Sequence, residues 1–384
     1  MITLTGVSWD HPRGHDPMVA TAEAYTRSHP DVRVVWETRS LKDFGDYPVE
    51  RLAERYDLIL VDHPFAGTAA STRCLLPVDD YVAADYLTAQ EAGSVGPSYA
   101  SYLSDGHLWA LPVDAAGQVS ALRPDLLDRP EPGSWAEVID LAREQRETAK
   151  PLVAIPLVPT DAVVSFFSIC ASLGTPPFSD SSGVVERPVG VEALAILKRL
   201  AALAHPESLG WNPIRTLDRM SDTDEITYAP LLFGYSNYAR PGFRHHLIRF
   251  TNVPRDGYGL PQGAVLGGVG LAVSARSANP REAFAYACFV ADPRTQRTIY
   301  FQAGGQPGHR SAWTDEAVNA AANGFFLDTL ETLDHAYLRP TDASYPTFQE
   351  EAGNIVHACL RGSLSIGDTL SQIDRLAERI NMPA

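Results

Sequence analysis

Three short runs of apolar and β-branched residues, ITLTGVSW, VRVVWE and YDLILVDH, predict buried strands in the first seventy residues. Helical spacing separates the runs, so the order β-α-β-α-β predicts parallel strands joined by right-handed crossovers. Ligands bind such sheets at the carboxyl ends of the strands. We therefore expect functional residues in segments 9–15 and 62–65.

The first helix is expected to begin at Asp16-Pro17 and to end before Pro30. Asp16 would be the N-cap. Pro17 would be the first helical residue, where the missing proline N–H has no partner to lose. On this interpretation residues 9–15 form a loop that follows the first strand.

The same analysis predicts a mixture of helices and strands along the rest of the chain. We expect a strand pair in HLWALPVDAAGQVSALRPDLL, a capped helix from Ser134 to about Arg146, helices over 160–173, 191–204 and 365–380, a helix opened by Asn279-Pro280, a polar loop over 218–224, and strands in TYAPLLFGYSNY and GAVLGGVGLAVS.

Composition limits the function. The 384 residues suffice for two lobes with a core each, and 45% hydrophobic with 20% charged residues is typical of globular proteins. No run approaches the roughly 20 apolar residues of a membrane helix. A net charge of -16 would repel nucleic-acid phosphates, and no basic aromatic patch offsets it. We expect neither nucleic-acid binding nor membrane insertion.

The four cysteines lie far apart, at positions 74, 170, 288 and 359, without the paired spacing of a metal or redox site. We expect free thiols, which lean towards a reducing compartment, and no cofactor. Residues after Met1 already form a strand, without a charged start, apolar run or cleavage site. This favours a cytoplasmic protein; an extracellular or lipid-anchored one is expected if a leader was removed.

Five segments follow one another in a recognisable order: HPDVRVVWE, YDLILVDHPFAGTAASTRCLLPVDDYV, DGHLWALPVDAAGQVSALRPDLL, PGSWAEVIDLA, and the run from VLGGVGLAVS to GGQPGHR. Each resembles a segment of one family. In order, these are HPDIKV between a helix and a strand, the LLPLDDY turn, DGKLYALPVD where the chain crosses between lobes, the P-x-TWDELL helix, and GG-x-P-x-R where the chain crosses back. That family is the extracellular solute-binding proteins of carbohydrate ABC importers, the maltose-binding-protein-like group.

The resemblance implies a two-lobed, periplasmic-binding-protein-like α/β fold (type 2). Each lobe would be a mostly parallel sheet flanked by helices, with the ligand cleft between the lobes. The first lobe would comprise residues 1–112 plus 265–312 and the second 113–264 plus 313–384, with hinge crossings near 112–114, 262–267 and 308–313. It also implies a monomer whose partners are a small-molecule solute and an ABC importer permease.

A solute site of this kind needs flat apolar faces and planar polar groups that bond hydroxyls. The candidates at the implied places are Trp9, Asp10, His11, Arg13, His63, Asp114, Trp211, Tyr235, Asn237, Gly267, Gly268 and Arg310. The two glycines would let backbone approach the ligand. Trp211 and Tyr235 are equally consistent with core positions, and Asp114 with a hinge cap that bonds backbone N–H groups.

The stretch DHPRGHD departs from the family, which has a short polar loop here. An imidazole oriented by Asp10 or Asp114 suits general acid or base chemistry, and Asp62-His63 repeats the Asp-His pair at another strand end. Ligand binding or loop stapling explains the same residues. A metal site on His11 and His15 is disfavoured, because the proline and glycine between them argue against a helix that would bring them together.

Two functions stay open. One is a binding protein that captures a sugar-like or carboxylate-bearing solute, for import or as a cytoplasmic homologue. The other is a metal-independent cytoplasmic isomerase, lyase or hydrolase on the same fold. Its acid and base residues would be His11, His15, His63 and Asp10, with Arg13 holding an anionic group. The fold alone does not decide between them.

Overall fold

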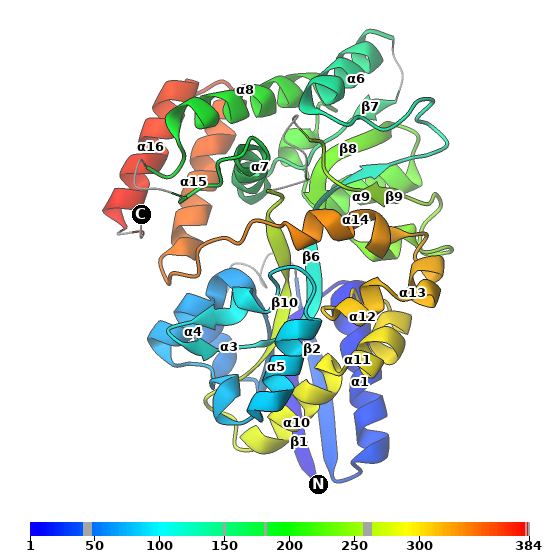
Figure 1. Ribbon diagram of the computed structural model, residues 1–384, viewed down its shortest axis with the longest axis vertical. Helices are drawn as coiled ribbons and strands as arrows, with labels where there is room; N and C mark the ends of the chain where they lie inside the picture. The colour runs from blue at the N-terminus through cyan, green and yellow to red at the C-terminus, as the bar shows by residue number, and fades with distance from the viewer. Residues whose placement is uncertain (41–47, 149–150, 180–182, 256–262, 381, 383–384) are drawn as a thin grey trace. The chain divides into compact units, whose positions relative to one another are not determined.

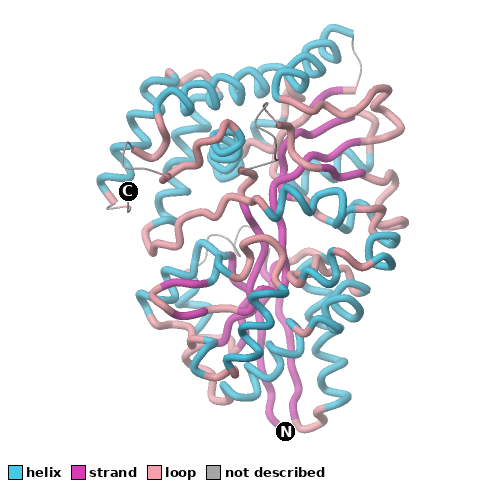
Figure 2. Tube along the Cα trace, viewed as in Figure 1, coloured by secondary structure: helices cyan, strands magenta, loops and turns pink. Residues whose placement is uncertain are grey.

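The computed structural model describes residues 1–40, 48–148, 151–179, 183–255, 263–380 and 382 of the chain (Figures 1 and 2). It divides into two compact units, each built from three segments. The first unit comprises Met1–Ala116, Gly267–Asn319 and Arg339–Ala343, and the second Gly117–Leu266, Ala320–Leu338 and Ser344–Ala384. Residues 313–319 and 339–343 thus lie in the first unit. The hinges expected from the sequence stay predictions, and Gln262 of the second one lies outside the described residues.

A sheet forms the centre of the first unit. Strand β1 (Ile2–Trp9) pairs in parallel with β2 (Val32–Arg39) on one side and β3 (Leu58–Asp62) on the other, which confirms the three parallel strands predicted from the sequence. Strand β10 (Leu266–Val273) is antiparallel to β3, and the long strand β6 (Leu111–Leu122) follows β10 in the sheet order.

Short helices connect these strands. They are α1 (Pro12–Ser28), α3 (Val49–Ala53), η1 (His63–Phe65), α4 (Ala66–Thr72), η2 (Val78–Asp80), α5 (Ala84–Gly93), η3 (Ala100–Tyr102), α10 (Pro280–Ala291), α11 (Pro293–Thr295), η6 (Gln296–Tyr300), α12 (Arg310–Trp313) and α13 (Glu316–Ala321), with a hairpin of β4 (Leu103–Ser104) and β5 (His107–Leu108). Helix α1 packs along β2 and also contacts α10.

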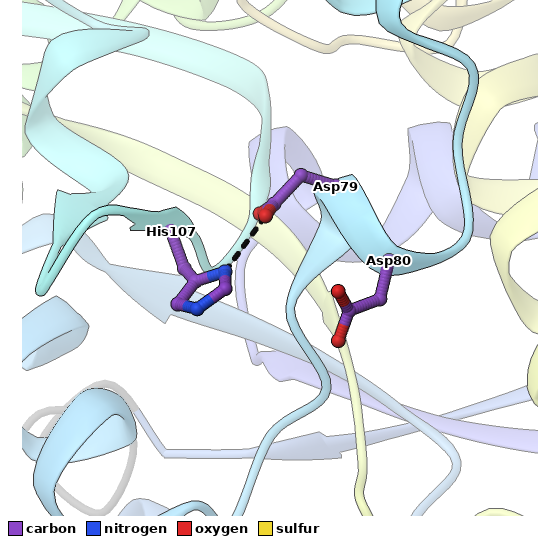
Figure 3. Close-up of side chains that lie close together, drawn as sticks. All are labelled: Asp79, Asp80 and His107. Atoms are coloured by element: carbon purple, nitrogen blue, oxygen red, sulfur yellow. Dashed lines mark hydrogen bonds and ion pairs between the residues drawn. The ribbon is translucent and has the colours of Figure 1, made fainter.

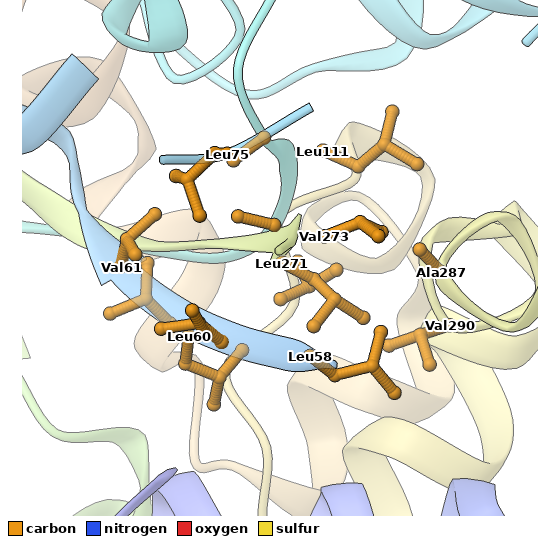
Figure 4. Packing of buried hydrophobic residues seen from close by; sticks show 14 of the residues in the cluster. Leu58, Leu60, Val61, Leu75, Leu111, Leu271, Val273, Ala287 and Val290 are labelled. Atoms are coloured by element: carbon orange, nitrogen blue, oxygen red, sulfur yellow. The ribbon is translucent and has the colours of Figure 1, made fainter. Parts of the chain in front are cut away.

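Part of the core of the first unit lies between this sheet and α10 (Figure 4), and residues of α1, α3 and α4 extend it. Leu58 and Leu60 point to one face of β3, because alternate residues of a strand share a face, and their register partners are Val273 and Leu271. All four are at most 1% exposed. Fully burying a side chain of this size contributes about 1.5–3 kcal/mol, so this packing helps to hold β3 in the sheet.

The second unit has a mixed sheet. Strand β6 pairs antiparallel with both β8 (Ile226–Phe233) and β9 (Arg249–Thr251), and β7 (Leu152–Val153) is parallel to β8. This sheet is therefore less parallel than the sequence suggested. Its helices are α6 (Trp135–Thr148), α7 (Pro159–Ser172), α8 (Arg187–Leu203), η4 (Ser208–Gly210), α9 (Pro213–Asp222), η5 (Ser236–Ala239), α14 (Phe325–Asp334), α15 (Tyr345–Leu360) and α16 (Ile366–Arg379). Residues of α6, α7, α8, α15 and α16 form a separate apolar cluster with the sheet.

The polar loop predicted over 218–224 is wrong, because helix α9 runs through Asp222. The Asn212 side chain caps this helix by accepting the N–H of Arg215 at 2.9 Å, and Pro213 is its first residue. Leu217 and Met220 are buried, so the polar residues of the segment occupy the solvent face of an amphipathic helix. The polarity was mistaken for a loop signal.

The capping box predicted before α6 is present in a modified form. The Ser134 hydroxyl accepts the N–H of Glu137 at 3.2 Å, and the Glu137 carboxylate accepts the N–H of Gly133 at 2.7 Å. Helices α7, α8, α10 and α16 lie within a turn of their predicted bounds. In the described part of the chain, none of the helices has the length and apolar character needed to cross a membrane.

Candidate functional site

Helix α1 begins at Pro12, five residues before the predicted start at Pro17. His11 is the N-cap: its backbone is extended and its Nδ1 accepts the N–H of Arg13 at 3.0 Å. Pro12 is the first helical residue, where proline is tolerated, and Pro17 lies inside the helix. The predicted loop over residues 9–15 is therefore wrong from Pro12 onward, and His15 lies in the first turn of the helix.

Gly14 explains how this helix lies so close to the strand before it. A Cβ atom at Gly14 would overlap the indole ring of Trp9, which is 4% exposed. The glycine that argued against a helix is thus a packing requirement. It lets the first turn of α1 lie directly on the last residue of β1.

Arg13 and Asp114 form a buried bidentate ion pair in the first unit. Arg13 Nε donates to Asp114 Oδ2 at 2.8 Å and Nη2 donates to Oδ1 at 2.5 Å. Burial raises the pKa of the Asp114 carboxyl, while Arg13 and the N–H of Val269 act in the opposite direction. Two residues separated by 101 positions, both predicted for the site, are thereby brought together.

His63 meets a residue that the sequence did not suggest. Arg339 Nε lies 3.1 Å and Nη2 2.9 Å from His63 Nε2, and both side chains are buried. A guanidinium has donors only, so His63 Nε2 is the acceptor and carries no proton. His63 is held in the first 3-10 turn after β3, whose last residue is Asp62.

The carboxyl group of Asp62 interacts electrostatically with Arg339 and with the Arg13–Asp114 pair. Burial raises the pKa of its carboxyl to about 6, Arg339 and Arg13 lower it, and Asp114 raises it further. Tyr102 adjoins the same group: its hydroxyl donates to the carbonyls of Val61 and Gly268 at 3.4 Å, and burial followed by Asp62 and Asp114 raises its pKa. We call Arg13, Asp62, His63, Asp114 and Arg339 the charged cluster.

Gly268 lies where two strands come close together, and the expected approach of Gly267 and Gly268 to a ligand stays a prediction. Gly268 has a φ of 107°, and a Cβ there would overlap the carbonyl oxygen of Asp114. Only glycine adopts this conformation at low cost, so β10 can follow β6 closely at this point. Gly267, its neighbour, is partly exposed and begins the first unit's share of β10.

The other predicted residues of the first unit lie nearer the solvent. Asp10 is exposed, and His15 is partly exposed, with its Nδ1 at 3.4 Å from Asp16 Oδ1. Arg310 is the first residue of α12, after the His309 N-cap, and is partly exposed. These three residues are not in the charged cluster.

Three predicted residues belong to the second unit. Trp211 is 2% exposed and stacks on His205, with ring centroids 4.5 Å apart. Tyr235 precedes η5 and meets Tyr238 edge-on at 6.5 Å, while Asn237 lies inside η5 and is buried. Trp211 therefore has a packing role, and a solute contact for the three stays a prediction.

Among the described residues, one group has the spacing of metal ligands. It consists of Asp79, Asp80 and His107, whose ligand atoms lie within 4.8 Å of one another (Figure 3). Asp79 accepts His107 Nδ1 at 2.7 Å and the N–H of Leu108 at 2.9 Å. Burial raises the pKa of Asp79, but these bonds lower it more. The contacts fasten the β4–β5 hairpin to η2, which explains the group without an ion.

Arg339 was the residue that sequence reasoning missed. It stands in an Arg-Pro-Thr stretch whose polar, proline-containing composition indicates a linker. Nothing local to that stretch shows that it packs beside His63, 276 positions earlier. Such a long-range contact leaves no periodic signal in a single sequence.

Comparisons with known proteins agree on the fold. A family model described as bacterial extracellular solute-binding protein matches residues 11–297. Maltose-bound MalE3 of T. maritima is 18% identical with a TM-score of 0.85 over 100% of both chains. The GacH receptor of Streptomyces glaucescens is 16% identical with a TM-score of 0.81, covering 98% of each chain.

A third structure is an ABC transporter solute-binding protein from Thermotoga lettingae bound with α-D-tagatose. It is 17% identical with a TM-score of 0.83, covering 99% of this chain and 100% of that one. No curated protein matches the sequence. These likenesses confirm the periplasmic-binding-protein-like α/β fold expected from the sequence.

Proposed function

The chain belongs to the bacterial extracellular solute-binding protein family, and from that premise we propose that it captures a small polar solute for an ABC importer. The observation that carries the proposal is the family match over residues 11–297, which includes the whole of α1, β3, β6 and β10. The importer permease would be its protein partner. The cellular compartment and the monomeric state stay predictions.

We further propose that the solute is a sugar or a polyol. The structural neighbours are bound to maltose, α-D-tagatose, ribitol and D-mannitol, which share a dense array of hydroxyl groups. Each hydroxyl both donates and accepts, so a site for them needs fixed groups of both kinds. The charged cluster supplies carboxylates as acceptors and guanidinium groups as donors.

The site proposed for contact with this solute is the carboxyl end of the sheet in the first unit. Arg13 follows β1, Asp62 ends β3, and Asp114 lies in β6. Hydrogen bonds hold the side chains of Arg13 and Asp114 against each other, and Asp62 interacts with the charges of both. A rigid polar group loses little entropy when a ligand binds, which favours affinity. The interlobe cleft implied by the family resemblance stays a prediction.

Catalysis finds no support in these contacts. His11 Nδ1 caps α1 and His63 Nε2 accepts from Arg339, so each ring has one nitrogen already engaged as an acceptor. His15 is partly exposed beside Asp16. The acid or base roles considered for these histidines are not part of the proposal.

A thermal-shift screen over sugars, polyols and sugar acids tests the proposal. A solute that binds the folded protein adds RT ln(1 + [L]/Kd) to its stability, about 2.7 kcal/mol at a hundredfold excess over Kd. We expect at least one sugar or polyol to raise Tm in a concentration-dependent way. If none does at millimolar concentration, while another solute class does, the sugar assignment is wrong.

A further inference from the structure

Residues 339–343 lie in the first unit although the chain on either side of them belongs to the second. We call this segment the strap. It has no helix or strand of its own, so hydrogen bonds within regular secondary structure do not hold it in place. Its position in the first unit must come from contacts with that unit.

The backbone of the strap lies directly against helix α4. A Cβ atom at Gly67 would overlap the carbonyl oxygen of Thr341 and lie 2.7 Å from the nitrogen of Ala343. Backbone atoms cannot turn away as a flexible side chain can. Glycine at position 67 is therefore required for the strap to lie where it does.

The side chain of Arg339 makes the second, independent contact. It reaches His63 through two donors, at 3.1 and 2.9 Å from Nε2. Because Nε2 is the acceptor in both contacts, the neutral His63 ring carries its proton on Nδ1. Arg339 thus selects one of the two tautomers of a buried histidine, which is 1% exposed.

The charges around this contact favour a neutral ring. Arg339 is cationic, and a protonated His63 would place a second cation against it. Asp62, at the end of β3, interacts electrostatically with Arg339 and with both members of the Arg13–Asp114 pair. The carboxylate of Asp62 therefore balances the guanidinium of Arg339, and the imidazole needs no charge.

We propose that Arg339 is a positioning residue of the solute site: it fastens the strap to the first unit and fixes His63 as the Nδ1-protonated tautomer. In this tautomer Nδ1 of His63 is a hydrogen-bond donor. The consequence for solute binding rests on the proposed function. The tautomer and the strap contact do not, and both are measurable in the solute-free protein.

The direct test is ¹⁵N NMR of the histidine rings in the full chain without solute, with the His63 signals assigned by their loss in His63→Gln. We expect protonated Nδ1 and unprotonated Nε2 in the wild type at pH 7.5. Arg339→Ala should shift the ring towards the other tautomer, and Arg339→Lys, which keeps one donor, should retain part of the wild-type signal.

Hydrogen exchange of peptides that cover 339–343 tests the strap. Gly67→Ala should raise exchange there at least tenfold and also disturb the His63 tautomer, because it displaces the segment that carries Arg339. Gly210→Ala is the matched control, since a Cβ at Gly210 meets no atom within 4 Å. Gly67→Ala displaces the strap but keeps the charge of Arg339, so it tests the proposal even if Arg339→Ala fails to fold.

Two results would overturn the proposal: a wild-type His63 protonated at Nε2, or a tautomer unchanged in both Arg339→Ala and Gly67→Ala. Solute titrations of the same proteins distinguish the outcomes. The expected tautomer with no solute that binds would leave the positioning role standing and contradict the proposed function. If a solute binds and the His63 tautomer is unchanged in both variants, the proposed function stands and the positioning role of Arg339 is contradicted.

Discussion

Each unit contains an arginine that is buried and paired with aspartate, yet the two networks differ in their carboxylates. Arg13 in the first unit holds Asp114, whose side chain is 0% exposed. Arg123 in the second unit holds Asp125 and Asp224, whose side chains are 54% and 69% exposed. The arginines are equally hidden, so the solvent around the carboxylates is what differs.

This difference reverses the net shift of the carboxyl pKa, although the arginine lowers that pKa in both networks. In the first unit burial raises the pKa of Asp114 in spite of Arg13. In the second, the hydrogen bond from Arg123 outweighs burial and lowers the pKa of Asp125. Desolvation thus dominates in the charged cluster, and such perturbed groups are typical of functional sites, whereas the pair at Arg123 is typical of structural ties.

The remaining contacts of Arg123 agree with a structural role. Its Nη1 donates to the carbonyls of Met220 and Thr223, both at 2.7 Å, at the end of helix α9. It therefore joins the end of β6 to the end of α9 and satisfies helix carbonyls. Arg13, by contrast, pairs with a carboxylate, and both members of that pair interact with Asp62. Asp62 also interacts with Arg339, so the first unit gathers several charges in one place.

The largest expected effect is that of Asp114→Ala. Removing one partner of a buried ion pair leaves Arg13 buried without its carboxylate, which costs about 3–5 kcal/mol of unfolding free energy. Urea denaturation at pH 7.5 measures the loss. The double variant Arg13→Met, Asp114→Leu should recover most of it, and a loss under about 1 kcal/mol in the single variant would show that Asp114 is not desolvated.

A pH-dependent effect is expected of Asp62→Asn. The folded-state pKa of Asp62 is about 6, raised from 3.8, so the folded protein holds this proton more strongly than the unfolded chain. Its contribution to stability is full below pH 3.8 and is lost as pH rises to about 6, by at most about 3 kcal/mol. Wild-type and variant stabilities, compared from pH 4 to 8, should diverge in favour of the variant. Parallel curves would contradict the shift.

Gly14→Ala should destabilise the first unit by about 1–3 kcal/mol, because the added methyl group overlaps the Trp9 ring. The helix propensity of alanine would by itself change stability in the opposite direction, by up to about 1 kcal/mol. Thermal unfolding of Gly14→Ala beside Gly367→Ala separates the two effects, because Gly367 lies in the first turn of α16 and a Cβ there meets atoms only at ordinary contact distance. A variant more stable than the wild type would mean that Trp9 moves aside freely.

The smallest effect is expected of Asp125→Ala, at about 0–1 kcal/mol. Its carboxylate is exposed, and Arg123 keeps Asp224 and two carbonyl partners. Urea denaturation under the conditions used for Asp114→Ala makes the comparison direct. Equal losses for the two aspartates would remove the distinction between the networks.

The sequence predicted strands and long helices better than polar segments. Alternation and helical spacing report burial, and burial decides where β1, β3 and α7 lie. The start of α1 was wrong because Pro12 and Gly14 were weighed as helix breakers. Pro12 is tolerated as the first helical residue, and Gly14 makes room for Trp9.

The sequence predicted only some members of the charged cluster, because it reports strand ends but not contacts between distant residues. Asp62-His63 and Arg13 follow strand ends, and the topology of parallel strands brings those ends together. The pairing of Arg13 with Asp114 and of His63 with Arg339 depends on the tertiary fold. A single sequence carries no periodic signal for such contacts, so Arg339 is not among the residues predicted for the site.

Calorimetric titration of the sugar or polyol found in the screen, into wild type, Asp62→Asn and Asp125→Asn, tests the central claim most directly. Asp62→Asn replaces a charged acceptor in the proposed site, and a hydrogen bond to a charged group contributes about 1.5–3 kcal/mol. We predict saturable binding to the wild type, at least tenfold weaker binding to Asp62→Asn, and unchanged binding to Asp125→Asn. Equal affinity of all three proteins would contradict a solute site at the charged cluster.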